Sequence, residues 1–160
     1  MGLEIERKFL VDEALLPPLP APHELHQGYL GSDPAVRVRL STLPSGERKA
    51  TLTIKGRGLI ERHEFEYPIP PGDAVELLNL CATSLCKKRY RLGRWEVDHF
   101  ADRGLWLAEI ELSRADEPFE RPAWLREEVS DDPRYQNVNL ARPNGSLGPS
   151  ADGRGAAPHA

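Results

Sequence analysis

The sequence lacks every feature that would place the chain in a membrane or on nucleic acid. No hydrophobic run approaches the roughly 18 apolar residues that a spanning helix needs. Charged residues begin at Glu4, where the apolar part of a secretory signal would lie. There is no basic excess either, since the formal net charge over 160 residues is −4. We therefore expect a cytoplasmic protein of one domain, with neither a membrane nor nucleic acid as partner.

Cysteine is also scarce, because Cys81 and Cys86 are the only two in the chain. Two thiols cannot build a disulfide scaffold, and their five-residue spacing without a nearby histidine pair matches no zinc site. We interpret both as reduced, partly buried thiols. A nucleophilic or redox role for Cys86 is the alternative, since Lys87, Lys88 and Arg89 could lower its pKa.

Short segments that alternate apolar and polar residues fill most of the sequence. Turn residues such as Gly93 separate these segments, which is typical of antiparallel strands joined by tight turns. About eight strands are predicted, at residues 3–11, 24–30, 35–41, 48–56, 60–70, 84–92, 94–100 and 105–113.

Helices are predicted in two other places. Residues 70–82 carry Pro71 and Asp73 at a helix start, followed by apolar residues at i, i+3 and i+4. A short helix near 122–128 and another after Pro133 are expected as well. From residue 143 the chain is mainly Gly, Pro, Ala and Ser, so we divide it into a domain at 1–142 and a disordered tail at 143–160.

The polar face of almost every predicted strand carries charge. A single charged face is explained by contact with water, but here the charges are segregated by sign. Glu4 and Glu6 lie on one acidic strand, whereas Arg37 and Arg39 lie on a basic strand. Glu109 and Glu111 form a second acidic pair, and the second basic pair is Lys87 and Arg89. This segregation favours a barrel with charged faces inward and apolar faces outward under helices.

A charged lumen indicates what such a barrel would bind. About eight strands leave space for side chains or one small ligand. Crowded like charges are unfavourable unless a ligand of opposite sign lies between them. Acidic strands suit a hard divalent cation and basic strands suit a multiply charged anion, and Mg²⁺ in proteins is commonly shared between carboxylates and substrate phosphates. The residues thus predict a metal-bound polyphosphate.

A series of motifs then supports a family resemblance over residues 2–142. In order they are EIERKFLV, QGYL, VRVRL, LTIKG, RHEFEY, KKRY, WEVD, LAEIEL and EEVSDDPRYQNVNLA. This set resembles the CYTH domain family, the triphosphate tunnel metalloenzymes. The resemblance implies an α+β fold in which an eight-stranded antiparallel β-barrel forms a tunnel with helices packed outside. Family members include inorganic and thiamine triphosphatases, class IV adenylyl cyclases and RNA triphosphatases.

The resemblance also implies roles for individual residues. The implied cofactor is Mg²⁺ or Mn²⁺, held by Glu4, Glu6, Asp98, Glu109 and Glu111. The implied catalytic residues are Lys8, Lys87 and Glu64. The implied contacts to the triphosphate are Lys8, Arg37, Arg39, Lys55, Arg62, Lys87 and Arg89.

The expected activity is metal-dependent hydrolysis of tripolyphosphate to pyrophosphate and phosphate, by a monomer or homodimer. Few aromatic residues are in phase with the charged faces to stack on a base, with Tyr29 and Phe100 as exceptions, while Trp95 and Trp106 follow the apolar stripes. One alternative is a class IV adenylyl cyclase or an organic triphosphatase. Another is a non-catalytic polyphosphate-binding module, against which the complete acidic set argues.

Overall fold

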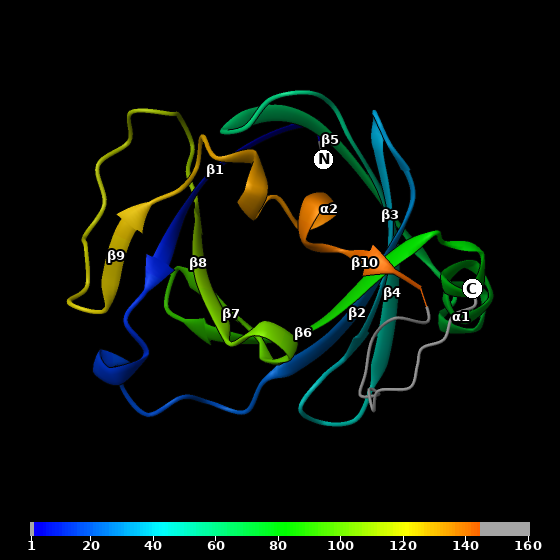
Figure 1. The fold of residues 1–160 in the computed structure, drawn as a ribbon, viewed down its shortest axis with the longest axis horizontal. Helices are drawn as coiled ribbons and strands as arrows, with labels where there is room; N and C mark the ends of the chain where they lie inside the picture. Colours follow the sequence, from blue (N-terminus) through cyan, green and yellow to red (C-terminus); the bar gives the residue numbers. More distant parts are fainter. Residues whose placement is uncertain (1, 145–160) are drawn as a thin grey trace.

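Eight antiparallel strands form the body of the protein, which the computed structural model describes from residue 2 to residue 144. They are β1 (Gly2–Val11), β2 (His23–Ser32), β3 (Ala35–Thr42), β4 (Arg48–Lys55), β5 (Glu61–Ile69), β6 (Thr83–Leu92), β7 (Trp95–Phe100) and β8 (Leu105–Glu111). Viewed end-on, they form one closed ring (Figure 1), whose interior we call the lumen. Their order is β6-β2-β3-β4-β5-β1-β8-β7, and β7 pairs back with β6. The predicted closed eight-stranded barrel is confirmed.

The alternation of each strand decides which side chains face the lumen, because successive side chains point to opposite faces. On β3, Arg37 and Arg39 line the lumen, whereas Val38 between them packs in an apolar cluster outside. On β1, Lys8 lines the lumen and the adjacent Phe9 packs outside. The barrel is therefore polar inside and apolar outside over this part of its wall.

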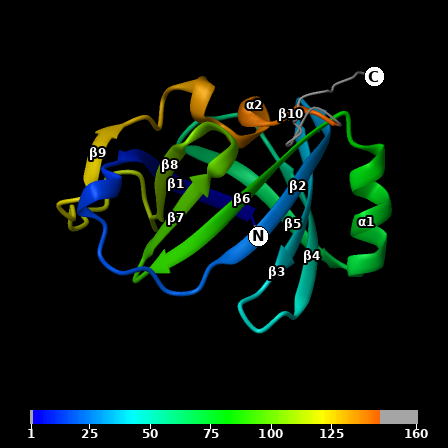
Figure 2. The ribbon, with the colours of Figure 1, turned by 60° about the horizontal axis from the view of Figure 1, so that its bottom comes forward.

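Two apolar layers cover the outside of the barrel. Helix α1 (Pro71–Leu80) packs over β2, β3 and β4 and buries Ala74 and Leu78 against them (Figure 2). On the side of β1, β7 and β8, residues 112–125 form the second layer, in which Trp124 meets Trp95 edge to face with ring centroids 5.6 Å apart. Burying these large apolar groups supplies the main favourable free energy of folding.

The last part of the described chain lies over one end of the barrel (Figures 1 and 2). There Leu140 packs against the fully buried Phe100 and Leu107, so the lumen is apolar at this end. The segment consists of the 3-10 turn η3 (Pro133–Tyr135) and helix α2 (Asn137–Leu140). No helix within residues 2–144 has the length and apolar character to cross a membrane.

One predicted helix is wrong. Residues 125–128, expected in a helix near 122–128, instead form the strand β9 (Leu125–Glu128), which pairs with β1. The pairing is reinforced by Arg7, which donates to both carboxylate oxygens of Glu128 at 2.7 and 2.5 Å. The helix expected after Pro133 is present as η3 and α2.

The start of the expected tail belongs to the barrel. Pro143, with Arg142, forms the short strand β10 (Arg142–Pro143) on β6, and the backbone N–H of Asn144 donates to Ala82. The rest of the tail that we predicted as disordered, residues 145–160, lies outside the described residues.

Candidate active site

The lumen holds a cavity of about 360 Å³ lined almost entirely by charged and polar side chains. Most of the residues implied by the resemblance meet in it. The predicted residues among its lining are Glu4, Glu6, Lys8, Arg37, Arg39, Lys55, Arg62, Glu64, Lys87, Arg89, Glu109 and Glu111. Asp98 is not part of the lining but lies directly behind Lys87 and Arg89, to which it is bound. The structure therefore brings the predicted site residues together from β1 and from β3 to β8.

The acidic side of the cavity is built by β1 and β8. Their register places Glu6 directly opposite Glu111, a like-charge pair that is unfavourable without a cation. Burial, followed by repulsion from Glu109 and Glu4, raises the pKa of Glu6 to about 7. Burial, then Glu4 and other nearby carboxylates, also raises the pKa of Glu111. Among the described residues, none forms an ion pair with Glu6.

This acidic side fits a divalent cation in its chemistry. Its donors are all carboxylate oxygens, the ligands that hard cations such as Mg²⁺ prefer. The half-buried Glu6, which has no ion-pair partner among the described residues, most favours a cation, because a nearby positive charge would lower its raised pKa. Within residues 2–144, however, no three His, Cys, Asp or Glu side chains are already gathered in a coordinating arrangement. The residues that would hold the cation are Glu4, Glu6, Glu109 and Glu111.

The basic side of the cavity is built mainly by β3. Burial, followed by the neighbouring Arg37 and Arg89, lowers the pKa of Arg39 to about 9. In the described part of the chain no carboxylate forms an ion pair with Arg39. Nε of Arg37 is buried without a hydrogen-bond partner, although its Nη2 donates to Thr53 at 3.2 Å. Nη2 of Arg37 also lies 3.4 Å from a carboxylate oxygen of Glu66. Arg39 thus offers unpaired positive charge to an anion, and Arg37 adds an unused Nε–H donor.

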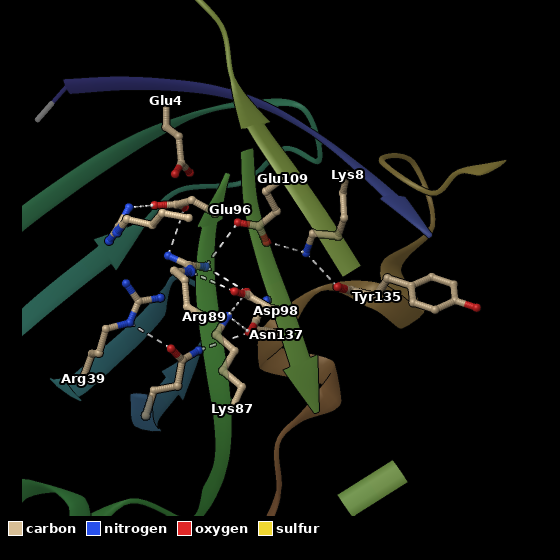
Figure 3. A network of polar contacts seen from close by, with 12 residues as sticks. Glu4, Lys8, Arg39, Lys87, Arg89, Glu96, Asp98, Glu109, Tyr135 and Asn137 are labelled. Carbon is tan, nitrogen blue, oxygen red and sulfur yellow. Dashed lines mark hydrogen bonds and ion pairs between the residues drawn. The ribbon is translucent and has the colours of Figure 1, made fainter. Parts of the chain in front are cut away.

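A second group of cations is neutralised by Asp98. Arg89 donates to both oxygens of Asp98 at 2.8 Å, and Nζ of Lys87 lies 2.7 Å from the same carboxylate (Figure 3). Burial would raise the pKa of Asp98, but Arg89 and Lys87 outweigh it and hold that pKa well below its usual range. Asp98 is therefore engaged with two cations in the described structure, unlike Glu6. Its role as a metal ligand stays a prediction.

Glu109 joins the acidic and basic groups. Its carboxylate lies 3.4 Å from Nζ of Lys8 and 3.5 Å from Nη2 of Arg89. Burial acts to raise its pKa, but Lys8 and Arg89 lower it to about 2. Glu109 is thus ionised at any physiological pH.

The β4–β5 side contributes a smaller group. Nζ of Lys55 lies 3.1 Å from Glu4 and 3.5 Å from Glu64, and Nε of Arg62 lies 3.5 Å from Glu4. Glu64, predicted as catalytic, is therefore in the cavity wall beside a predicted substrate contact.

Several uncharged groups of the site escaped sequence reasoning. The backbone carbonyl of Tyr135 accepts from Nζ of Lys8 at 2.7 Å, and Oδ1 of Asn137 accepts from Nζ of Lys87 at 2.7 Å (Figure 3). Gln27 is fully buried and binds Arg39. The position of Gln27 on the same strand face as Tyr29 could have revealed it. No periodic pattern in the sequence indicates that Tyr135 or Asn137 belongs to the site.

The cysteines take no part in the site. Cys86 is exposed, and neither cysteine is among the residues that line the cavity. Burial, followed by Asp102 and Glu24, raises the pKa of Cys86. The suggestion that its basic neighbours lower this pKa is therefore wrong, and both thiols are free.

The fold and the cavity together define the class. This is a small closed β-barrel whose lumen carries unpaired carboxylate on one side and unpaired guanidinium on the other. The model of the CYTH domain family matches residues 2–142, and the chain belongs to that family.

Two curated relatives are similar over nearly their whole length. An inorganic triphosphatase of Acetivibrio thermocellus is 40% identical over 153 residues, covering 89% of this chain and 95% of the relative. An inorganic triphosphatase of Nitrosomonas europaea is 32% identical over 151 residues, covering 86% of this chain and 96% of the relative. A crystal structure of the inorganic triphosphatase NE1496 superposes with a TM-score of 0.57 at 32% identity, covering 86% of this chain and 93% of that one.

Proposed function

We propose that this chain is a divalent-cation-dependent inorganic triphosphatase, which hydrolyses tripolyphosphate to pyrophosphate and phosphate. One observation carries the proposal: the unpaired Glu6 and the unpaired Arg39 line the same cavity. A cation with a multiply charged anion satisfies both groups at once, whereas either ion alone satisfies one. Membership of the CYTH domain family and the two relatives named inorganic triphosphatases support the same reaction.

The residues of the cavity divide into roles for this reaction. Arg37 and Arg39 offer forked N–H donors to phosphate oxygens, and Lys55 and Lys87 act as point charges. Glu64, in the cavity wall, is our candidate for orienting the water whose oxygen forms the new bond to phosphorus while the phosphoanhydride bond breaks. A bound Mg²⁺ or Mn²⁺ would supply charge neutralisation on the phosphate oxygens. Lys8, held between Glu109 and the carbonyl of Tyr135, stabilises the negative charge that develops on the leaving pyrophosphate.

The aromatic residues favour an inorganic substrate over a nucleotide. Tyr29 and Trp95 are the aromatic residues that line the cavity within residues 2–144. The ring of Trp95 packs in the outer apolar layer against Phe9 and Trp124. Tyr29 is itself buried and bound to Gln27. The cavity lining formed by residues 2–144 offers no further aromatic ring to stack on a base. We extend the proposal to a cytoplasmic location.

Phosphate release from a substrate panel tests the function. The purified chain is assayed with tripolyphosphate, ATP, thiamine triphosphate and pyrophosphate, each with Mg²⁺, with Mn²⁺ and with EDTA. We expect tripolyphosphate with a divalent cation to be the fastest reaction and EDTA to abolish it. Faster release from ATP or thiamine triphosphate would overturn the inorganic assignment.

A matched pair of variants ties the activity to the cavity. Arg39→Ala should lower kcat/KM for tripolyphosphate about 100-fold, because a half-buried guanidinium without an ion-pair partner is lost from the anion site. Arg48→Ala removes an exposed arginine at the start of β4 and should leave kcat/KM within about twofold. Equal rates for the two variants would contradict the proposal.

A further inference from the structure

Arg39 is held in place by a neutral acceptor. Its Nε donates to Oε1 of Gln27 at 2.9 Å, and Gln27 is completely buried. The contrast is Arg89, which is bound by the carboxylates of Glu96, Asp98 and Glu109. Arg39 is therefore oriented without being neutralised, whereas the charge of Arg89 in the same lumen is neutralised.

The orientation of the Gln27 amide is fixed from its other side. Oδ1 of Asn137 accepts from Nζ of Lys87 at 2.7 Å and from Nε2 of Gln27 at 3.2 Å. Protonated Lys87, which is paired with Asp98, can only donate, so the Asn137 atom facing it must be the oxygen. Because this oxygen can only accept, the Gln27 group that faces it must be the NH₂ group. Oε1 of Gln27 is then the atom that faces Arg39. Figure 3 shows Asn137 beside Lys87, with Arg39 on the opposite side of this network.

We propose that Gln27 and Asn137 form an amide bridge that positions Arg39 for the triphosphate while keeping its positive charge available. Both are positioning residues, which act through Arg39 rather than on the substrate. The inference rests on the proposed function for the identity of the anion. It extends that function by naming two uncharged residues, one on β2 and one on α2, that determine the strength of anion binding.

The neutrality of position 27 is the critical property. A carboxylate there would have the same shape and would still accept from Nε of Arg39. It would also form a charge-assisted bond and compete with a phosphate oxygen for the guanidinium. The variant Gln27→Glu therefore keeps the shape of the side chain, adds a charge and removes the Nε2 donor to Asn137 and Tyr29.

The test measures tripolyphosphate binding by calorimetry in EDTA, so that no turnover occurs. Gln27→Glu should weaken the affinity at least tenfold. The control Gln136→Glu adds the same charge to the same cavity, at a buried residue to which Arg39 donates no hydrogen bond in the described chain, and should cost less than threefold. In an Arg39→Met background, Gln27→Glu should also cost less than threefold, because the residue through which it acts is gone.

Three results would overturn the bridge: unchanged affinity of Gln27→Glu, an equal loss in Gln136→Glu, or an undiminished loss in the Arg39→Met background. Absence of binding by the wild-type chain would overturn it too, since no anion site would then be positioned. If Gln27→Glu does not fold, Asn137→Ala replaces it. That variant frees the Gln27 amide to rotate and should weaken binding several-fold with Arg39 present but not with Arg39→Met.

Binding and turnover separate this inference from the proposed function. If the wild-type chain binds tripolyphosphate with the pattern above but releases no phosphate with Mg²⁺ or Mn²⁺, the function fails and the bridge stands. If phosphate is released but Gln27→Glu binds normally, the bridge fails and the function stands. With turnover intact, Gln27→Glu should raise KM more than it lowers kcat.

Discussion

The carboxylate of Glu6 shows how a single residue can be costly for folding and essential for function. It is half-buried opposite Glu111, its pKa is raised to about 7, and none of the described residues forms an ion pair with it. We predict that Glu6→Gln stabilises the metal-free protein at pH 8 by about 1 kcal/mol, because one of two facing like charges is removed. The same variant should lower phosphate release about 100-fold, because a cation ligand is lost. Urea unfolding and the phosphate assay measure the two effects.

The control for this residue is Glu13→Gln, which changes an exposed carboxylate in the turn η1 (Glu13–Leu15) far from the cavity lining. It should change the unfolding free energy by no more than about 0.5 kcal/mol and the rate of phosphate release by no more than about twofold. A Glu6→Gln protein that is less stable than wild type, or as active, would contradict the prediction.

For individual residues, the sequence predicted the charged side chains of the lumen but not the groups to which they are bound. Period-two alternation was enough to place Arg39, Glu6 and Lys87 in one lumen, because strand geometry is local. It could not assign Asn137 to Lys87, since that contact joins residues 50 positions apart and depends on how the chain crosses the barrel end. Gln27 is uncharged, so the segregation of charge by strand does not mark it. The phase of β2 alone would have placed it inward.

Among the elements, helix α1 sits so close to β2 that the strand requires glycine at the contact. A Cβ built on Gly28 would lie 2.7 Å from Sγ and 2.9 Å from Cβ of Cys81, and 3.0 Å from Cδ2 of Leu78. We predict that Gly28→Ala destabilises the protein by about 1 to 3 kcal/mol, because the helix end must move off the sheet. Thermal or urea unfolding measures the loss.

Two further variants separate close packing from backbone freedom. Gly72→Ala, in the first turn of α1, meets nothing within 4 Å and should be neutral or slightly stabilising. Truncation of the opposing thiol in Gly28→Ala/Cys81→Ala should recover part of the loss, since it removes the atom in closest contact. No recovery would mean that the cost at position 28 arises elsewhere.

Prediction at the element level succeeded where the pattern is long and failed where it is short. In the eight barrel strands, apolar and polar residues alternate over several positions, and this pattern was enough to predict the barrel. Residues 125–128 read Leu-Arg-Glu-Glu, which has no strand preference of its own. They form β9 because β1 pairs with their backbone and Arg7 binds Glu128. Both interactions join residues far apart in the sequence and exist only in the folded barrel.

For the molecule as a whole, the lumen makes the stability of the metal-free protein depend on pH in an unusual direction. The folded pKa of Glu6 is about 7, above its ordinary value of 4.5. Between these values the folded protein keeps a proton that the unfolded chain has released. Stability from this group is therefore complete below about pH 4.5 and falls as pH rises to about 7. At one pKa unit per about 1.4 kcal/mol, a decline on the order of 3 kcal/mol is expected.

Lys87 should reverse the trend above neutrality. Burial, partly offset by Asp98, lowers its pKa from 10.5 to about 7, so the folded protein holds fewer protons than the unfolded chain between these values. Stability from Lys87 therefore rises with pH across that range. The two groups together predict a minimum in the unfolding free energy of the metal-free protein near pH 7.

Unfolding in urea from pH 4.5 to 9 in EDTA, repeated with Mg²⁺, tests this minimum. With the cation present, the decline between pH 4.5 and 7 should disappear, because cation binding favours the ionised carboxylates. Glu6→Gln should remove the same decline without any cation, whereas Glu13→Gln should retain it. A monotonic rise in stability from pH 4.5 to 7 in EDTA would mean that Glu6 is ionised and compensated in the empty lumen, and the argument that the acidic side requires a cation would fall with it.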